Sequence, residues 1–538
     1  MRQLAKLLSL GCLSTLFLIS CSSKERPAYT NNVIAAAQPL ASKAGEQMYA
    51  LGGNAFDAAV AAGFTLAVVE PSMSGLGGRL QAIYQTQTGE IAGVDASTEV
   101  PKNYTPSTVK HSFGYPTIGI PGVVAGLLKL HQDKGSLTLT QVLAPAIKAA
   151  EEGYAILPGE AYRQQMAVDK VKTLSGSAYH FLNEKGEAPE AGDIIVQKDL
   201  AEVLKAIAKK SKKGFYEGDV AQKMVDDIQA NGGILTLEDL KNYKALSSRV
   251  LHGKYYGHDI HSLYLPSYGA ITIQILQILD HLKGIQSEEQ WAQEVGEATK
   301  IAYTYRKKQD NQDSLALILS YARAGKLAQQ IREEAYTFTA DFDQNTPVSW
   351  TVKQGHTSHL TAVDQWGNAV SLTQTVGPNM GSKVATKGLG FLYAVTLGGY
   401  LGDYKPGDRA NSHITPTLVT KEGALVLALG AAGGSRIVTA VTQVISRFLG
   451  QKHPLDKAVF LPRVYPFQDS LWVEDHATVK AVNADLNPAE YPVKYIEEIA
   501  RFGRVHAIAK DPESDSWVGA ADPDWEGTSE YFSSERKD

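Results

Sequence analysis

The chain has 538 residues, of which 44% are apolar and 20% are charged, a composition typical of a globular protein with a large core. The formal net charge of −5 and the lack of a basic run or a Cys/His ladder argue against nucleic acid as a partner.

The first 32 residues predict export. Two basic residues precede the apolar stretch 7–19, which is too short for a conventional membrane span and is typical of the core of a signal peptide. This stretch runs into LISC (18–21), which resembles a bacterial lipobox, so residues 1–20 would be removed and Cys21 would carry a lipid. The alternative is a plain secretory signal with an incidental cysteine. We expect a bacterial lipoprotein, periplasmic or at the cell surface, attached to the membrane through Cys21 alone.

Only one other cysteine is present, and it lies inside the predicted signal peptide. The mature chain would therefore have no disulfide framework and no cysteine nucleophile. Covalent catalysis would fall to Ser, Thr, Lys or a carboxylate.

The predicted elements follow in chain order. A polar tether over 21–32 is followed by a helix over 41–51 that ends at Gly52-Gly53, and Asn54 is placed to cap a second, apolar helix over 55–69. The later predictions are a hairpin over 80–95, mainly helix over 117–300, an exposed loop over 341–355, strands over 357–363, 369–376 and 424–429, and a helix over 435–449. Strand pairs combined with packed helices indicate a layered α+β fold.

A strand–turn–strand pattern covers residues 355–376. The turn over 364–368 carries a glycine late in the loop, and a pairing symmetric about Trp366 places Thr375 opposite Thr357. Facing threonines can hydrogen-bond, and taken alone this pattern is more often a threonine ladder without chemistry. An N-terminal threonine, however, is a known nucleophile whose own α-amine serves as the base. The irregular loop before Thr357 offers the required break point.

A second pattern covers residues 424–445. A strand runs into Gly430-Ala-Ala-Gly-Gly434, and Ser435 is placed to cap the helix that follows. Backbone amides at such a turn bind an anion, which in acyl transfer is the tetrahedral oxyanion. The alternatives are a phosphate loop, which the lack of a following lysine disfavours, and a simple close-packed turn.

HTSHLTAVDQWGNAVSLTQT (356–375) resembles the start of the small subunit of the gamma-glutamyltranspeptidases, a family of N-terminal nucleophile hydrolases. Further blocks resemble the same family in the same order: LGGNAFDAAVAAGFTLAVVEPSMSGLGG (51–78), IGIPGVVAGLLKL (118–130), NGGILTLEDLKNYKA (231–245) and LPSYGAITIQIL (265–276). The resemblance implies a four-layer αββα sandwich, formed after self-cleavage by a large subunit (33–356) and a small subunit (357–538) that associate as a heterodimer.

The resemblance also implies roles for individual residues. Cleavage would fall between His356 and Thr357, and Thr357 would be the nucleophile. Thr375 would hydrogen-bond the nucleophile, and the amides of Gly433 and Gly434 would form the oxyanion hole. We interpret His359 as structural. The thirteen histidines are scattered and no HExxH spacing occurs, so we predict no metal and no cofactor.

The chain departs from the family where the family grips the glutamyl group. Ser97 stands where a D-F-R-E type segment has its arginine, Ser412-His413 replaces a Ser-Ser pair, and Gly377 replaces an asparagine. AVTLGG (394–399) stands where an Asn-Gln-x-Asp-Asp segment binds the α-amino group. Arg79 stands where the glycine-rich loop has a glycine. The segment 400–413 is too short for the family's lid loop.

We therefore expect an amide hydrolase or acyltransferase with an altered acyl pocket, its candidate substrate-binding residues being Arg79, Ser97, Ser412 and His413. An open cleft would admit a longer substrate, such as a peptide or polymer. The alternatives are true gamma-glutamyl activity on glutathione, the related cleavage of cephalosporin-type amides, and a surface scaffold of the same fold without turnover.

Overall fold

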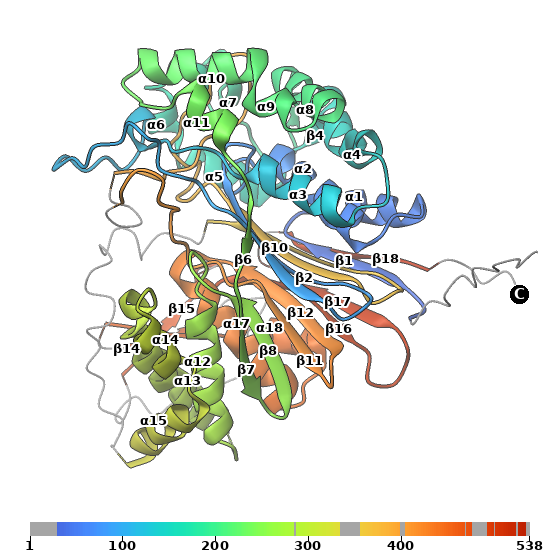
Figure 1. Cartoon of the computed structure of the whole chain (residues 1–538), viewed down its shortest axis with the longest axis vertical. Helices are drawn as coiled ribbons and strands as arrows, with labels where there is room; N and C mark the ends of the chain where they lie inside the picture. The colour runs from blue at the N-terminus through green and yellow to red at the C-terminus, as the bar shows by residue number, and fades with distance from the viewer. Residues whose placement is uncertain are drawn as a thin grey trace, which may run out of the picture.

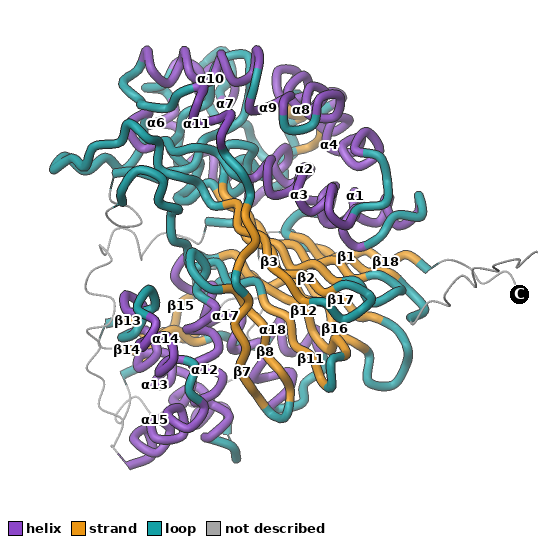
Figure 2. Tube along the Cα trace, viewed as in Figure 1, coloured by secondary structure: helices purple, strands orange, loops and turns teal. Residues whose placement is uncertain are grey.

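The computed structural model describes residues 29–284, 287–333, 356–398, 404–468, 470–475, 492–499, 501–522, 524 and 526–533. Two large β-sheets pack face to face, and helices cover the outer face of each (Figures 1 and 2). The predicted α+β sandwich with layers in the order αββα is thereby confirmed. The predicted signal peptide, residues 21–28 of the tether and the predicted loop 341–355 lie outside the described residues.

The first sheet contains strands from both predicted subunits. Its order is β18 (Thr528–Phe532), β1 (Asn32–Ala36), β9 (Ser358–Val363), β10 (Ala369–Thr375), β2 (Arg79–Gln85), β3 (Ile91–Ala96) and β6 (Leu246–Ser248). All of these neighbours are antiparallel. Because β9 and β10 lie between β1 and β2, a break before β9 would leave the two parts joined by the hydrogen bonds of one sheet.

The second sheet has the order β17 (Trp517–Ala521), β16 (Arg504–Lys510), β12 (Ala424–Ala432), β11 (Thr417–Lys421), β8 (His258–Leu263) and β7 (Val250–Tyr255). The β7–β8 hairpin interrupts the region predicted as mainly helical; its turn contains Tyr256 and Gly257, both at positive φ. Smaller sheets join β13 (Val464–Phe467), β14 (Ser470–Glu474) and β15 (Val493–Ile496), and β4 (Tyr154–Ala155) with β5 (Ile194–Ile195).

The helical layer outside the first sheet comes from the N-terminal half of the chain. Its members are α1 (Pro39–Ala50), α2 (Ala55–Val69), α3 (Val123–Lys134), α4 (Leu139–Glu152), α5 (Pro158–Gln165), α6 (Val168–Val171), α7 (Ser175–Phe181), α8 (Lys198–Lys210), α9 (Lys213–Tyr216), α10 (Gly218–Ala230) and α11 (Leu237–Asn242). The predicted capping of α2 is confirmed, because the Asn54 side chain accepts from the amides of Phe56 and Asp57. Every residue of α2 is buried, as a sequence that is apolar nearly all round the helix predicts.

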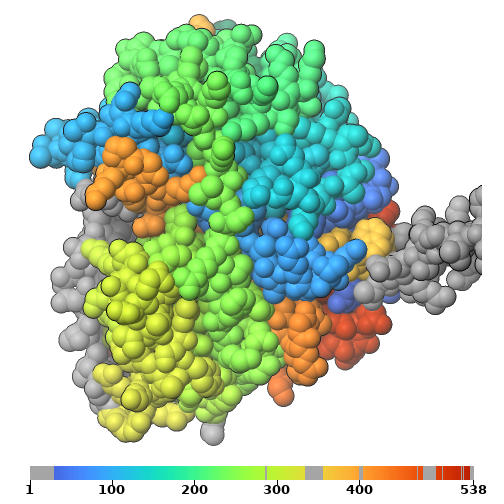
Figure 3. Space-filling view, in the orientation of Figure 1, coloured from blue at the N-terminus to red at the C-terminus, as the bar shows by residue number. Residues whose placement is uncertain are grey.

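The helical layer outside the second sheet contains α12 (Gly269–His281), α13 (Glu288–Tyr303), α14 (Gln312–Ile318), α15 (Tyr321–Glu333), α17 (Ile437–Ile445) and α18 (Leu455–Phe460). In the space-filling view the first helical layer forms the upper, blue-to-green part of the molecule, and α12–α15 form the green-to-yellow part below it (Figure 3). Each layer has its own large hydrophobic core against its sheet. A smaller apolar cluster, which includes Val33, Val363 and Trp517, joins the two sheets.

Residues 29–32, which we predicted as the end of the tether, are docked on the body. The Asn31 side chain donates to the carbonyl of Trp517 at 2.9 Å and accepts from the Trp517 amide at 2.8 Å. The polar side chain of Asn31 therefore pairs with backbone groups of Trp517, the first residue of the edge strand β17.

Toward the predicted nucleophile, the interface between the sheets is polar. His359 is fully buried there, with its ring nitrogens 2.8 Å from the hydroxyl of Thr373 and 3.0 Å from that of Thr361. Its ring stacks on that of His506 at 6.3 Å. Gly430 leaves room for the ring, since a Cβ there would lie 2.3 Å from His359 Cε1. The partners of His359 agree with its interpretation as a structural residue.

Burial lowers the pKa of His359 from 6.5 to about 3. The unfolded chain therefore binds this proton at higher pH than the folded protein does. The contribution of His359 to stability is complete above pH 6.5 and is lost progressively as the pH falls from 6.5 toward about 3. We expect His359→Gln to reduce the slope of the free energy of unfolding against pH in this window by about 1.4 kcal/mol per pH unit. Urea denaturation at several pH values measures the slope, and equal slopes for both proteins would contradict the prediction.

Candidate active site

The register of the first sheet aligns three of the sequence-predicted residues. Gln374 pairs with Ser358 and Thr373 with His359, so the next step of the same register brings Thr375 opposite Thr357. Thr375 itself pairs with Arg79 on β2. Directly opposite residues of antiparallel strands project from the same face. Thr357, Thr375 and Arg79 thus occupy one row at the end of three adjacent strands.

The same row extends to β3. Leu80 pairs with Ala96, so Ser97 continues the register opposite Arg79. With neighbouring strands about 4.8 Å apart, Ser97 lies one strand further from Thr357 than Arg79 does. The face that carries the row looks toward the second sheet, because side chains of the same parity, Thr361 and Ser371, donate to carbonyls of β16 and β12 at 2.9 and 2.7 Å.

Thr357 is only 3% exposed and stands immediately before β9. Its hydroxyl donates to the carbonyl oxygen of His356, the residue that precedes it. The nucleophile that we predict and the peptide bond that it would cleave are therefore in direct contact. Thr375 is equally buried, and its hydroxyl oxygen accepts from the amide of Gly377 at 2.9 Å. The expected hydrogen bond between the two threonines stays a prediction.

β12 continues to Ala432, three residues beyond the predicted strand end at 429, so the turn that we predicted over 430–434 is reduced to Gly433 and Gly434. Gly433 has φ 147° and Gly434 has φ 61°, conformations that side chains disfavour. The helix capping differs from our expectation: a 3₁₀ turn (Gly434–Arg436) follows the loop, and α17 begins only at Ile437. The Ser435 hydroxyl lies 3.3 Å from that of Tyr465, and the Ser435 carbonyl accepts from the hydroxyl of Tyr303 at 2.6 Å. Two aromatic hydroxyls thus hold the loop.

The loop and the nucleophile meet through β16. Arg504, the first residue of β16, pairs with Ala432 immediately before the glycines. Its guanidinium donates to the backbone carbonyl of Thr357 at 3.1 Å. The predicted nucleophile and the predicted oxyanion loop therefore lie at the same end of the two sheets.

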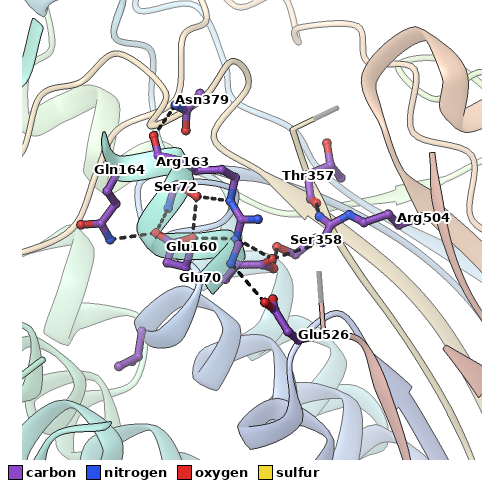
Figure 4. A network of polar contacts seen from close by, with 12 residues as sticks. Glu70, Ser72, Glu160, Arg163, Gln164, Thr357, Ser358, Asn379, Arg504 and Glu526 are labelled. Atoms are coloured by element: carbon purple, nitrogen blue, oxygen red, sulfur yellow. Dashed lines mark hydrogen bonds and ion pairs between the residues drawn. The ribbon is translucent and has the colours of Figure 1, made fainter. Parts of the chain in front are cut away.

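A buried ionic network lies beside Thr357 (Figure 4). The Glu70 carboxylate accepts from the hydroxyl of Ser358 and forms ion pairs with Arg163 at 3.1 Å and Arg504 at 3.5 Å. Arg163 also pairs with Glu160 at 2.9 Å. Burial raises the pKa of Glu160, against the opposing effect of the Arg163 charge. Our sequence reasoning missed this network, although a charged residue that directly follows the apolar stretch 66–69 of a buried helix is a signal for a buried ion.

The candidate substrate-binding residues are divided between two places. Arg79 is 1% exposed, and its guanidinium donates to the carbonyl of Val395. Ser97 is fully buried and accepts from the side-chain amide of Gln81 at 2.8 Å. Both belong to the row that contains Thr375.

Ser412 and His413 lie on the connection toward β11. The amide of Ser412 donates to the carbonyl of Pro266 at 2.8 Å, and the imidazole of His413 lies 3.2 Å from the guanidinium of Arg306. Burial lowers the pKa of His413 well below 6.5, and the Arg306 charge adds to this shift. His413 is therefore neutral at physiological pH. The short segment in place of a lid falls partly outside the described residues, since 399–403 are not among them.

The described part of the chain contains no cluster of three or more His, Cys, Asp or Glu side chains arranged to hold a metal ion. The groups at this end of the sheets are the hydroxyl of Thr357, the guanidinium of Arg504 and the glycine loop after β12. Such a set suits acyl transfer through a tetrahedral oxyanion.

The sequence and the fold of this chain are similar to those of several known proteins. The family model described as Gamma-glutamyltranspeptidase matches residues 41–532. The chain is 30% identical over 511 residues to the glutathione hydrolase proenzyme of Pseudomonas sp. (strain A14), with 88% of this chain and 87% of that protein covered. It is 28% identical over 501 residues to the capsule biosynthesis protein CapD proenzyme of Bacillus anthracis, with 92% and 90% covered. Among solved structures it is similar to a cephalosporin acylase from Bacillus halodurans, with a TM-score of 0.84, 26% identity, and coverage of 93% and 96%.

The two loop glycines should respond differently to an added methyl group. A Cβ on Gly433 would lie 2.6 Å from the Cα of Gly503, whereas nothing lies within 4 Å of a Cβ on Gly434. We expect Gly433→Ala to lower the free energy of unfolding by about 3 kcal/mol or more, since strain and a backbone clash combine. Gly434→Ala, the matched control, should cost only about 1 kcal/mol, because its backbone lies in the left-handed helical region. Urea denaturation of both variants tests this, and equal losses would show that Gly503 does not confine the loop.

Proposed function

The chain belongs to the gamma-glutamyltranspeptidase family of N-terminal nucleophile hydrolases, and we propose that it is a self-processed amide hydrolase or acyltransferase whose nucleophile is Thr357. The observation that carries this proposal is the position of Thr357: it is buried immediately before β9, next to the carbonyl of His356 and in register with Thr375. That the relatives of this chain are named proenzymes supports processing into two associated subunits.

During maturation the peptide bond between His356 and Thr357 is cleaved. The Thr357 hydroxyl oxygen attacks the carbonyl carbon of His356, and the peptide nitrogen leaves as the α-amine of Thr357. Water then hydrolyses the resulting ester, giving a carboxylate on His356 and restoring the hydroxyl of Thr357. The products are chains 21–356 and 357–538. The hydrogen bonds that β9 and β10 make to β1 and β2 keep them together.

Turnover uses the amine that maturation frees. The α-amine of Thr357 accepts the hydroxyl proton while the oxygen attacks a substrate amide. The amides of Gly433 and Gly434 donate to the oxyanion, a contribution that is commonly worth about 3–4 kcal/mol per donor. The leaving amine takes the proton, and water or an acceptor amine then removes the acyl group from Thr357. Thr375 orients the nucleophile.

The acyl group differs from the gamma-glutamyl group of the family. Position 97, which carries the family's carboxylate-binding arginine, is a buried serine, and the charged segment that binds the α-amino group is the apolar stretch 394–399. Arg79 supplies a cation from β2, whose backbone lies one strand spacing, about 4.8 Å, closer to β10 than that of β3 does. A substrate carboxylate bound by Arg79 would sit nearer to the scissile amide than the carboxylate of a gamma-glutamyl group does. Ser97, Ser412 and His413 complete this altered pocket.

The length of segment 400–413 supports an open cleft that admits a longer substrate, such as a peptide or a polymer. The alternative of true gamma-glutamyl activity on glutathione is favoured by the name of the Pseudomonas relative, and cleavage of a cephalosporin-type amide by the similarity to the Bacillus halodurans acylase. A scaffold without turnover is the non-enzymatic alternative. It does not explain why the hydroxyl of Thr357 is directed at the preceding carbonyl.

We also propose that the protein is exported and anchored through a lipid on Cys21. The basic and apolar residues before LISC (18–21) support this proposal. No helix in the described ranges has the length and apolar character that crossing a membrane requires.

Self-cleavage can be read directly from the purified protein. We expect chains of 336 and 182 residues, since residues 21–356 and 357–538 follow removal of the signal. Thr357→Ala should give one uncut chain, whereas Thr357→Ser should still be cut because it keeps the hydroxyl. Intact mass spectrometry measures both products and would also show the lipid on Cys21. A wild-type protein without a new terminus at 357 would refute the catalytic proposal.

The role of Arg79 can be tested with acyl amides that differ in charge. We expect Arg79→Met to lower kcat/KM for acyl groups that carry a carboxylate by roughly 10- to 150-fold, the loss expected for one charge-assisted hydrogen bond of about 1.5–3 kcal/mol. Neutral acyl amides serve as the internal control and should be unaffected. Equal losses on both substrate classes would mean that Arg79 maintains the fold and does not bind the acyl group.

A further inference from the structure

The start of β16 contacts both halves of the proposed catalytic machinery. Gly503 packs against Gly433 so closely that a Cβ on Gly433 would lie 2.6 Å from the Cα of Gly503. The next residue, Arg504, donates to the backbone carbonyl of Thr357 at 3.1 Å. Two consecutive residues therefore connect the oxyanion loop with the nucleophile.

Arg504 is itself held by a buried partner. Its side chain is 2% exposed, and its guanidinium lies 3.5 Å from the carboxylate of Glu70. Glu70 follows the last residue of α2, and its carbonyl accepts from the amides of Met73 and Ser74 at 3.1 and 2.9 Å. The carboxylate thus stands on a hydrogen-bonded turn at the end of a wholly buried helix.

The Glu70 carboxylate also accepts from the hydroxyl of Ser358, the first residue of β9. Thr357 and Ser358 are therefore linked to the same carboxylate, one through Arg504 and the other directly (Figure 4). Arg163 gives the carboxylate a second cationic partner at 3.1 Å. The carboxylate is consequently fixed from three directions.

Self-cleavage increases the importance of this connection. Thr357 precedes the first residue of β9, so the ladder does not hold it, and a chain end without such contacts is mobile. After the bond to His356 breaks, the carbonyl of Thr357 still accepts from Arg504. The contact then limits the motion of a residue whose hydroxyl and amine must both be placed for reaction.

We propose that Arg504 and Glu70 are positioning residues that hold Thr357 in register with the Gly433 loop once the chain is cut. The proposal rests on the proposed function of Thr357. Arg504 also places a cation near the new α-amine, which favours the neutral amine that acts as the base. Neither residue touches the substrate.

The test measures the nucleophile without an identified substrate. A β-lactone probe acylates Thr357: the hydroxyl oxygen attacks the lactone carbonyl, and the ring opens to a hydroxyl group. The second-order rate of labelling is followed by intact mass spectrometry across pH, and the rate of self-cleavage is followed on gels. Arg504→Lys, Arg504→Met and Ser358→Ala are compared with the wild-type protein.

The matched control is Arg447→Lys. Arg447 is another buried arginine; it pairs with Glu288 at 2.9 Å and donates to the carbonyl of Pro462 at 2.9 Å, away from Thr357. The Arg447→Lys variant should have a melting temperature lowered about as much as that of Arg504→Lys, and its labelling rate should be unchanged. The control separates loss of a buried ion pair from loss of position.

We expect Arg504→Lys to slow labelling about 100-fold, the effect of a misplacement near 1 Å, and Ser358→Ala to slow it about tenfold. Arg504→Met should in addition move the acidic limb of the pH profile upward by about one unit, because the cation near the amine is gone.

If the Arg504 variants do not fold, Ser358→Ala decides the question. Folded variants that label at the wild-type rate and pH overturn the positioning role alone. A wild-type protein that neither cleaves nor labels at Thr357 overturns the proposed function as well.

Discussion

The antiparallel pairing of β9 with β10 is the constraint on which the site depends. Its register brings Thr375 opposite the position before β9, and the pairing of β10 with β2 continues the same row to Arg79. A shift by one residue would turn these side chains away from the second sheet. The five-residue turn with Gly367 at φ 88° fixes the register, so a short local sequence decides where the hydroxyl of Thr357 points.

The second sheet turns this row into a reaction site. It buries Thr357, supplies the glycine loop after β12, and contributes Arg504 at the position paired with Ala432. The charge of Arg504 requires compensation in a buried place, and removal of one partner from such a pair commonly costs about 3–5 kcal/mol. Glu70 provides this compensation, and Arg504, Arg163, Glu70 and Glu160 together form a network of two cations and two anions. Thr357, the proposed nucleophile, is therefore held next to a buried network in which positive and negative charges are balanced.

The altered acyl pocket that we propose would follow from two substitutions on the same pair of strands. Arg79 and Ser97 are cross-strand neighbours by register, so exchanging the family's glycine and arginine at these two positions moves a cation by one strand. The strand pairing that aligns Thr357 with Thr375 is not changed by this exchange. Such an exchange would change the acyl group that the site accepts while the strand pairing is retained.

The amino-acid sequence by itself determined the local features: the cap of α2 by Asn54, the β2–β3 hairpin, and the β9–β10 pairing symmetric about Trp366. These depend on turn chemistry and periodicity within a few residues. Only the tertiary structure decided the hydrogen bonds between Asn31 and β17 and the partners of Arg504. Arg504 reaches Thr357 across 147 residues, and Ser358 reaches Glu70 across 288. One arginine in an apolar strand gives no sign of its partner, because the packing of the two sheets, and not the spacing along the chain, brings the charges together.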